Sequence, residues 1–502
     1  MEKKIIKKLL IANRGEIAIR IIETAKKLGI ETYVIKTAKE PSALYLKHAD
    51  VICDFTQNTN ELPEFLDVEL IIKTAKEHKV DAIHPGYGFL AENPYFAQCC
   101  DDEGIIFIGP SADAIYKMGN KTIAKQLAIK HKVPLLEGSS GNVPSPKEAL
   151  KIAEKIGYPV IIKAASGGGG RGMRIVEDAS QVEKMFHLAS NEAAKAFDDS
   201  SVFIEKYVRN PRHIEFQILG DKHGNIIHLG ERECSIQRKH QKLIEESPSV
   251  ALSEELRKIM GEQAINIAKS VKYCSVGTVE FLLDDDMNFY FMEMNTRIQV
   301  EHPVTETITG IDLIEQQIKM AQGDKLSIKQ EDVQLNGWAI EYRINAEDVQ
   351  ANFSPFLGTI QHISFPKGKN VRVDTGVEDG SVITPYYDSM VAKLIVSGET
   401  REKAIANSLV AINKVKIKGV KTTIPFCKAV IENKDFQLGN LNTSFIDKKM
   451  DGIFNEDPDE KLMAAFFATM DYIKDEQMDE AAYVDFEKGR NITPWLIKRR
   501  IK

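Results

Sequence analysis

Short apolar runs alternate with amphipathic segments over residues 1–110. Strands are expected at Leu9–Ala12 and in ETYVIK, and further strands in VDAIHPG and IIFIGP. Between the first two strands, Glu16–Leu28 carries apolar residues at helical spacing and stops at Gly29. This rhythm predicts a parallel sheet with helical crossovers, so residues 1–115 are expected to form an α/β domain. Only NRGE follows the first strand, where a dinucleotide site needs G-x-G-x-x-G, so such a site is not expected.

The pattern changes again beyond this domain. A helical stretch is expected over Ala114–His131 and a helix in EALKIAEKIG. A strand in GYPVIIKAA, a glycine-rich turn and the strand RIV are expected to follow. After Phe203 the pattern is rich in strands, near Gly337 it shifts to short strands and turns, and from Lys449 it is charged and helical. The expected divisions are therefore residues 1–115, 116–325 and 336–446 and a helical tail, 449–502. Such a chain is of mixed α/β and α+β class.

Composition narrows the class of protein. Of the 502 residues, 43% are hydrophobic and 28% charged, as in ordinary globular chains, and the net charge of −7 argues against a nucleic-acid or anionic-membrane partner. The six cysteines form no C-x-x-C pair, which argues against a zinc or disulfide framework and favours a reducing compartment. The basic, apolar start lacks a signal-peptide cleavage site, and no uncharged stretch approaches the roughly 20 residues that span a bilayer. A soluble, cytoplasmic protein is expected.

Four successive glycines follow a lysine at the end of a predicted strand. In PVIIKAASGGGGRGMRIV, Lys163 precedes the run Gly167, Gly168, Gly169 and Gly170. Consecutive glycines expose backbone N–H groups to phosphate oxygens, and a lysine on the strand adds a positive charge. The run lacks the G-K-[ST] of a P-loop, so a flap that closes over a triphosphate is favoured over a flexible surface hairpin.

Two carboxylates face each other in a predicted hairpin. If GTVEFLL pairs with NFYFMEMNTR, Leu283 falls opposite Tyr290 and Glu280 opposite Glu293. Directly opposed residues have Cβ atoms about 4.5–5.5 Å apart, and two carboxylates that close repel unless a proton or a cation lies between them. Mg²⁺ suits such oxygen ligands, and strand alternation places Asn295 on the same face. A metal site is favoured over two solvated edge carboxylates because the flanking residues are apolar.

Two further segments carry candidate groups. Directly after the hairpin, RIQVEHPVTE holds Gln299 and Glu301, a carboxylate that could act as a base on a small substrate, and Arg297 could hold an anion. In ERECSIQRKHQKLIEESP, Gln237, His240 and Lys242 interleave, which fits either an anion site or a solvated charged face.

Eight strings in order resemble one family. HPGYGFLAEN places Tyr87 after a parallel strand, and EYRINAED places Arg343 on another strand. With LIANRGEIAIRI, IIKAASGGGGRGM, EKYVRNPRHIEFQ, ERECSIQRKHQK, EMNTRIQVEHPVTE and PYYDSMVAKL, these strings resemble the biotin carboxylases of the ATP-grasp superfamily over about residues 5–448. The resemblance implies a Rossmann-like N-terminal domain, an ATP-grasp domain with a mobile lid over about residues 133–204, and a C-terminal domain. The segment VIKTAKEPSALYLKHAD departs from the family pattern.

The resemblance implies a role for each candidate residue. The implied ATP contacts are Lys121, Lys163, Gly167, Gly168, Gly169, Gly170, Glu205, Lys206, Val208, His213, Gln237, His240 and Leu282. The implied Mg²⁺ (or Mn²⁺) ligands are Glu280, Glu293 and Asn295. The implied bicarbonate and biotin pocket consists of Lys242, Arg297, Gln299, Val300, Arg343 and Tyr87. Glu301 is the implied base, assisted by Arg297, Arg343 and Lys242.

The implied reaction has two stages. Glu301 takes the bicarbonate proton, and the oxygen attacks the γ-phosphorus of ATP to give carboxyphosphate and ADP. Carboxyphosphate then yields CO₂ and phosphate, and the phosphate deprotonates biotin. The chain has no A-M-K-M biotinylation motif and too few residues for a carboxyltransferase, so both partners are expected on separate chains, with a homodimer by resemblance.

Three alternatives stay open at this level. Another ATP-grasp ligase could join a carboxylate to an amine, although RIQVE and Arg343 argue against it. A nucleotide-binding scaffold without turnover is the second, and the retained charged residues argue against that. The third concerns only the final acceptor: acetyl-CoA or another acyl-CoA, pyruvate, or 2-oxoglutarate.

Overall fold

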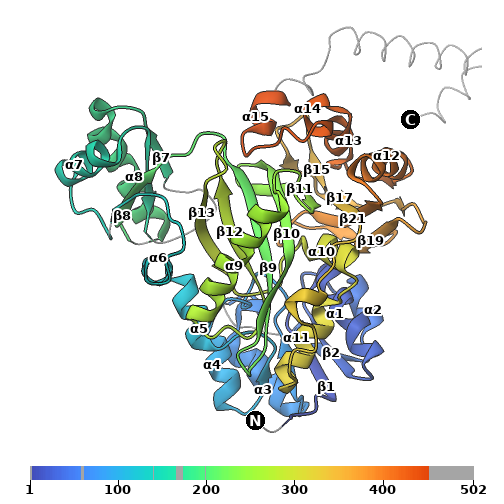
Figure 1. Ribbon diagram of the computed structural model, residues 1–502. Helices are drawn as coiled ribbons and strands as arrows, with labels where there is room; N and C mark the ends of the chain where they lie inside the picture. Colours follow the sequence, from blue (N-terminus) through green and yellow to red (C-terminus); the bar gives the residue numbers. More distant parts are fainter. Residues whose placement is uncertain (1–2, 58–61, 140, 166–172, 198, 451–502) are drawn as a thin grey trace, which may run out of the picture. The chain divides into compact units, whose positions relative to one another are not determined.

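The computed structural model describes residues 3–57, 62–139, 141–165, 173–197 and 199–450 (Figure 1). The described residues up to Met450 form one compact unit. Apart from Lys449 and Met450, the predicted helical tail lies outside the described residues, as do Gly167, Gly168, Gly169 and Gly170. No helix of the described part is long and apolar enough to cross a membrane.

A five-stranded parallel sheet forms the N-terminal region, in the order β3-β2-β1-β4-β5. Its strands are β1 (Lys8–Ile11), β2 (Glu31–Lys36), β3 (Val51–Asp54), β4 (Ala82–His84) and β5 (Ile106–Phe107). Its helices are α1 (Gly15–Lys27), α2 (Leu44–His48), α3 (Val68–Glu77) and α4 (Pro94–Asp102), with a 3-10 turn η1 (Glu64–Leu66). The predicted α/β domain is confirmed, because apolar strands alternate with helices that bury one face.

The helical stretch predicted over Ala114–His131 consists of two helices. They are α5 (Ala112–Gly119) and α6 (Lys121–Lys130), and the break between them was not predicted. The break falls at Asn120, whose side chain accepts a hydrogen bond from the backbone N–H of Ile123 and caps α6. An Asn that satisfies an orphan N–H stabilises a helix start, and the apolar period alone does not reveal it.

A separate three-stranded antiparallel sheet, in the order β7-β6-β8, carries Lys163. Its strands are β6 (Val160–Ala164), β7 (Met173–Val176) and β8 (Val202–Lys206). Helices α7 (Pro146–Ile156) and α8 (Val182–Phe197) pack on it around their own apolar core, with a 3-10 turn η2 (Ala179–Gln181). The strand and helix predictions for this segment are confirmed.

An eight-stranded sheet, in the order β13-β12-β9-β10-β11-β14-β21-β19, holds most of the polar residues of interest. Its strands are β9 (Arg212–Gly220), β10 (Ile226–Arg238), β11 (Gln241–Ser247), β12 (Ser275–Leu283), β13 (Phe289–Asn295), β14 (Trp338–Asn345), β19 (Val371–Thr375) and β21 (Met390–Gly398). Its helices are α9 (Glu254–Ser270), which lies along β10 and β9 in Figure 1, α10 (His302–Thr309) and α11 (Leu313–Gln322). Because β11 pairs with β14, the sheet continues across the change of pattern near Gly337.

The remaining elements follow the sheet in sequence. They are η3 (Gln330–Asp332), β15 (Glu347–Asp348), β16 (Ser354–Pro355), β17 (Gly358–Thr359), β18 (His362–Ser364), β20 (Val382–Ile383), α12 (Arg401–Ile412), β22 (Lys416–Lys418), α13 (Ile424–Glu432), α14 (Lys434–Gln437) and α15 (Phe445–Lys449). The short strands match the predicted region of strands and turns, and the mixed α/β and α+β class is confirmed.

The hairpin register was only half predicted. Glu280 lies opposite Glu293, as expected, but Leu283 lies opposite Phe289 rather than Tyr290. A β-bulge between the two pairs shifts the register by one residue. Such a bulge inserts an extra residue into one strand, and alternation alone does not locate it.

Candidate active site

The Lys242 ammonium on β11 is at the centre of the candidate site. It contacts the carboxylates of Glu215 on β9 at 2.5 Å, Glu280 on β12 at 3.0 Å and Glu301 at 2.6 Å. All three carboxylates are buried. Burial lowers the pKa of Lys242, but the three carboxylates outweigh it and raise the pKa well above its usual range. The ammonium is therefore charged at any physiological pH.

Glu301 bridges two cations. It occupies the N-cap position of α10, and its second carboxylate oxygen accepts a hydrogen bond from the Arg343 guanidinium on β14 at 2.9 Å. Burial alone would raise its pKa, but Lys242 and Arg343 hold the pKa of Glu301 below its usual range. The carboxylate is thus ionised, which is the form that a base requires.

Arg343 has a second carboxylate partner. Its Nε donates to Glu245 on β11 at 2.6 Å, and a terminal nitrogen lies 2.5 Å from the same oxygen. The guanidinium is consequently shared between Glu245 and Glu301, and the same terminal nitrogen contacts both carboxylates. This arrangement fixes its orientation within the sheet.

Glu280 accepts hydrogen bonds from two amides and lies beside a histidine. Asn295 Nδ2 donates at 2.9 Å, Gln299 Nε2 at 2.8 Å, and His213 Nε2 lies 3.1 Å from its other oxygen. Burial would lower the pKa of His213, but Glu280 raises it above its usual value. Gln237 Nε2 lies 3.5 Å from Nδ1 of His213, which extends the network to β10.

Glu293 is the more open of the opposed carboxylates. Its side chain is exposed, whereas that of Glu280 is buried. Desolvation and then the Glu280 carboxylate raise the pKa of Glu293, against the opposing charge of Lys121. With the amide of Asn295, these residues form the oxygen-rich donor set that Mg²⁺ or Mn²⁺ prefers.

Arg297 lies at the rim of this cluster. Its Nε donates to Glu92 at 2.8 Å, and a terminal nitrogen donates to the amide oxygen of Asn295 at 3.1 Å. Glu92 belongs to the HPGYGFLAEN segment and also accepts from the backbone N–H of Thr296 at 2.9 Å. The N-terminal region therefore supports the end of the hairpin.

Two lysines share one carboxylate at the three-stranded sheet. Lys163 on β6 lies 2.8 Å from Glu205 on β8, and Lys125 on α6 lies 2.5 Å from the other oxygen of Glu205. Burial raises the pKa of Glu205, but the two lysines outweigh it and lower the pKa to about 2. A cavity of about 310 Å³ beside them is also lined by Lys121, whose pKa burial lowers.

The other predicted nucleotide contacts are more scattered. Lys206 Nζ donates to the carbonyls of Gly157 and Tyr158, at 3.0 Å each. Val208 follows β8, and Leu282 pairs with His213 across β12 and β9. His240 is exposed in the β10–β11 turn with a φ of 66°, and no described contact joins it to Lys242. The hydrogen bonds of the described residues therefore do not join Lys206, Val208 or His240 to the cluster around Lys242.

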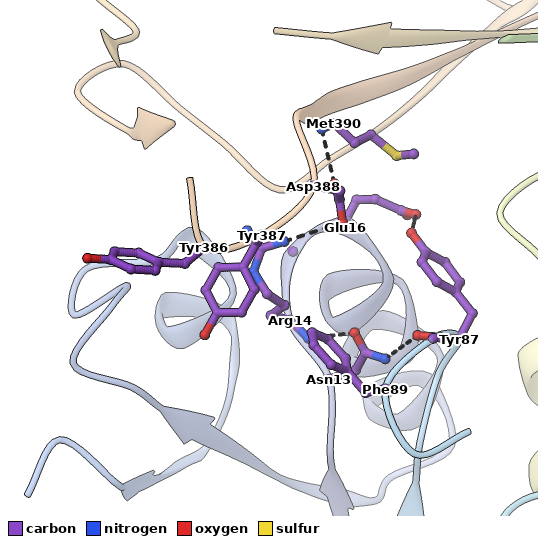
Figure 2. Close-up of a pocket in the computed structure, with 11 residues that line it drawn as sticks. Asn13, Arg14, Glu16, Tyr87, Phe89, Tyr386, Tyr387, Asp388 and Met390 are labelled. Carbon is purple, nitrogen blue, oxygen red and sulfur yellow. Dashed lines mark hydrogen bonds and ion pairs between the residues drawn. The ribbon is translucent and has the colours of Figure 1, made fainter. Parts of the chain in front are cut away.

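Tyr87 lines a second cavity of about 370 Å³ (Figure 2). Its hydroxyl donates to Glu16 on α1 at 2.5 Å, and burial raises the pKa of Tyr87 well above its usual value. Figure 2 shows Tyr386 and Tyr387 on the opposite side of the cavity, with Arg14 between. Val300 lies near the same region, where its carbonyl accepts from Lys393 at 2.9 Å.

Several residues of the site were not predicted from the sequence. Arg232 on β10 is fully buried and donates to Glu215, Gln217, Thr278, Gln299 and Thr305. The others are Glu92, Lys125, Glu215 and Glu245. Charged residues inside otherwise apolar strands, as in HIEFQ and ERECS, were the signal that could have found the buried ones.

Three family models match successive parts of the chain. Residues 5–115 match the biotin carboxylase N-terminal domain, and residues 341–448 match the biotin carboxylase C-terminal domain. Between them, residues 120–329 match the ATP binding domain of the carbamoyl-phosphate synthase L chain.

Relatives and solved structures agree with these matches. Biotin carboxylase 1 of Bacillus subtilis is 50% identical over 444 residues, covering 88% of this chain and 98% of the relative. The 2-oxoglutarate carboxylase small subunit of Hydrogenobacter thermophilus is 48% identical over 442 residues, covering 88% and 93%. A crystal structure of the biotin carboxylase domain dimer of that enzyme, with MgADP, ADP and bicarbonate, has a TM-score of 0.86 at 46% identity, covering 90% of this chain and 100% of that one.

The fold and the charged site therefore define an ATP-dependent ligase with an ATP-grasp fold. Within that class the chain belongs to the biotin carboxylase family.

Proposed function

We propose that this chain carboxylates biotin on a separate carrier protein, using ATP and bicarbonate. The observation that carries the proposal is the position of Lys242, whose ammonium contacts both Glu280 and Glu301. One lysine thereby links the carboxylate proposed for the metal to the carboxylate proposed as the base. A phosphoryl-transfer site needs positive charge at this junction, where bicarbonate meets the γ-phosphate.

Glu301 is the proposed base. Its ionised carboxylate takes the proton of bicarbonate, and Lys242 and Arg343 hold the carboxylate in place. Arg297 is the proposed bicarbonate anchor, together with Gln299 and the backbone of Val300. Lys242 stabilises the negative charge that develops as the bicarbonate oxygen attacks the γ-phosphorus.

The nucleotide is proposed to bind along the three-stranded sheet. Lys121 and Lys163 neutralise its phosphates, and the glycines at 167–170 close over them. The remaining contacts proposed for it are Glu205, Lys206, Val208, His213, Gln237, His240 and Leu282. Glu280, Glu293 and Asn295 would hold Mg²⁺ or Mn²⁺, which neutralises phosphate charge when bound.

Arg343 and Tyr87 are proposed to serve biotin. The Arg343 guanidinium lies beside Glu301, so it can stabilise the negative oxygen of the biotin enolate. Tyr87 lines the second cavity, which supports a place at the biotin entrance.

The assembly is proposed to need other chains. A biotin carrier protein and a carboxyltransferase would be separate subunits, and this chain would be a homodimer, as the Hydrogenobacter biotin carboxylase domain is. A relative that is 47% identical over 447 residues is named propionyl-CoA carboxylase alpha chain, so we propose acetyl-CoA or another acyl-CoA as acceptor. Relatives named for pyruvate and for 2-oxoglutarate support those two acceptors as alternatives. All six cysteines are unpaired thiols, which supports a cytoplasmic location.

The proposed domains are residues 1–115, residues 116–325 and residues 336–446. The second of these includes the proposed lid over about residues 133–204.

The test is ADP release from the purified chain with MgATP, with bicarbonate or free biotin omitted in turn. Turnover that requires both substrates is expected. Turnover that is indifferent to biotin would assign the chain to another ATP-grasp reaction and remove the proposed roles of Arg343 and Tyr87.

A further inference from the structure

Two carboxylates without a role in the proposed reaction lie side by side next to Arg343, on the neighbouring strands β11 and β14. Glu245 on β11 and Glu341 on β14 are directly opposite in the antiparallel register. Directly opposed residues have Cβ atoms about 4.5–5.5 Å apart. Both side chains are fully buried, at 0% exposure. Bulk solvent therefore does not reach the two carboxyl groups.

The hydrogen-bond donors around the pair are too few for two ionised carboxylates. One oxygen of Glu245 accepts from Arg343, whereas its other oxygen and both oxygens of Glu341 have no hydrogen-bond partner in the described part of the chain. A buried carboxylate without donors is costly, and two such charges side by side repel strongly. A single proton between the two groups removes both difficulties.

The neighbouring charges do not replace that proton. Arg343 is already divided between Glu245 and Glu301, and Lys393 binds Glu16 at 3.0 Å and a backbone carbonyl at 2.9 Å. The titratable and charged groups that act on the pair are Lys242, Arg343, Lys393, Glu301, Cys234 and Cys427. Burial raises the pKa of Glu341 well above its usual value and that of Glu245 to about 7.

We propose that Glu245 and Glu341 share one proton and thereby limit the charge of this pair, on the side of Arg343 away from Glu301, to a single negative charge. The guanidinium then keeps its positive potential on the side that faces Glu301. Loss of the proton would add a second negative charge behind the guanidinium and weaken its attraction for an anion. Glu341 is in this view a positioning residue for Arg343. The link between Glu341 and catalysis rests on the proposed function. The shared proton itself is independent of that function.

The proton itself can be observed by infrared spectroscopy. The folded wild-type chain at pH 7.5 is expected to show the carbonyl stretch of a protonated carboxylic acid that is absent from Glu341→Gln. If Glu341→Gln does not fold, Glu245→Gln is expected to shift the frequency of this band, because the acid at Glu341 then loses the carboxylate with which it shares the proton. A spectrum in which the folded variant keeps every carboxylic acid band of the wild type overturns the shared proton.

The consequence for Arg343 is tested by pH profiles of kcat/KM for free biotin, which report ionisations of the free enzyme. Glutamine at 341 is permanently neutral, so the alkaline fall of the wild type is expected to move upward by at least about one pH unit. Glu246→Gln is the matched control, since Glu246 is the next residue of β11, equally buried, and pairs instead with Arg401 and Trp338. An alkaline fall that is absent from the wild type, or is the same in wild type and Glu341→Gln, overturns the role for Arg343.

The two experiments separate this inference from the proposed function. A wild-type chain that shows the band but needs no biotin for turnover retains the shared proton and loses the biotin chemistry. A chain with biotin-dependent turnover but no such band retains the proposed function and loses the shared proton.

Discussion

At the scale of single residues, the site is a balance of buried charges rather than a set of separate catalytic groups. Lys242 and Arg343 together contact four carboxylates, and Glu301 is the one that both contact. Desolvation of each group alone would favour its neutral form, so every ionised member depends on its partners. Replacement of one member therefore changes the protonation of its neighbours as well as its own chemistry.

Glu301→Gln tests the proposed base directly. Glutamine keeps the shape but cannot accept a proton, so bicarbonate-dependent ADP release is expected to fall by about 10²–10⁴-fold. Binding of MgATP, measured by calorimetry, is expected to persist because no nucleotide contact is assigned to Glu301. Glu315→Gln, on the surface of α11 beside Lys319, is the control and is expected to retain turnover. Normal turnover of Glu301→Gln would contradict the assignment.

His228 predicts a pH dependence of stability. Burial, and then Arg257, lower its pKa from 6.5 to about 4, and its Nδ1 accepts from the backbone N–H of Gly230. A depressed folded pKa means that the unfolded chain binds the proton first, so stability is full above pH 6.5 and is lost as pH falls toward 4. Between pH 7.5 and pH 5 this residue alone is expected to cost about 2 kcal/mol.

The measurement for His228 is urea unfolding of wild type and His228→Gln at both pH values. The difference in unfolding free energy between the two proteins is expected to shrink by about 2 kcal/mol at pH 5. A difference that does not change with pH would show that His228 is not the titrating group.

At the scale of elements, local capping and one bulge determine where the site residues point. Apolar spacing predicted α1, β2, β6 and the hairpin, because burial of one face determines that spacing. It did not predict the break between α5 and α6 or the bulge in β13, because these depend on single side-chain and ladder hydrogen bonds. The bulge separates two registers of the β12–β13 pair. Glu280 lies opposite Glu293 on one side of the bulge, and on the other side each residue of β13 is shifted by one position.

Asn120 is therefore expected to affect both stability and nucleotide binding. Asn120→Ala removes the cap of α6 and is expected to cost about 1 kcal/mol in urea unfolding. Lys121 is the first residue of that helix, so fraying is also expected to raise the KM for ATP while kcat changes less. Asn120→Asp retains a capping oxygen and serves as the control. Equal KM values for Asn120→Ala and Asn120→Asp would argue against a link between the cap and Lys121.

At the scale of the whole described unit, buried ion pairs join segments that are far apart in sequence. Lys393 on β21 is fully buried and lies 3.0 Å from Glu16 on α1 and 3.8 Å from Asp374 on β19. The strings that predicted the family also predicted the residues near Lys242, because they are contiguous motifs with recognisable chemistry. They did not reveal pairs such as Arg232–Glu215 or Lys393–Glu16, since the fold alone brings those partners together.

Lys393→Met tests whether this buried cation stabilises the unit. The change leaves Glu16 and Asp374 without their shared cation in a buried site, so the unfolding free energy is expected to fall by about 3–5 kcal/mol. In the double variant with Glu16→Gln, one of the uncompensated charges is gone, and a coupling energy of about 1–3 kcal/mol is expected in a urea double-mutant cycle. Lys47→Met is the matched control, because Lys47 also pairs across a long sequence separation, with Glu378, but both side chains are exposed. The control is expected to cost less than about 1 kcal/mol. If Lys393→Met also lowered the unfolding free energy by less than about 1 kcal/mol, the buried pairs would contribute no more than the surface pair. The ion pairs of Lys393 would then not stabilise the packing of α1 against β19 and β21.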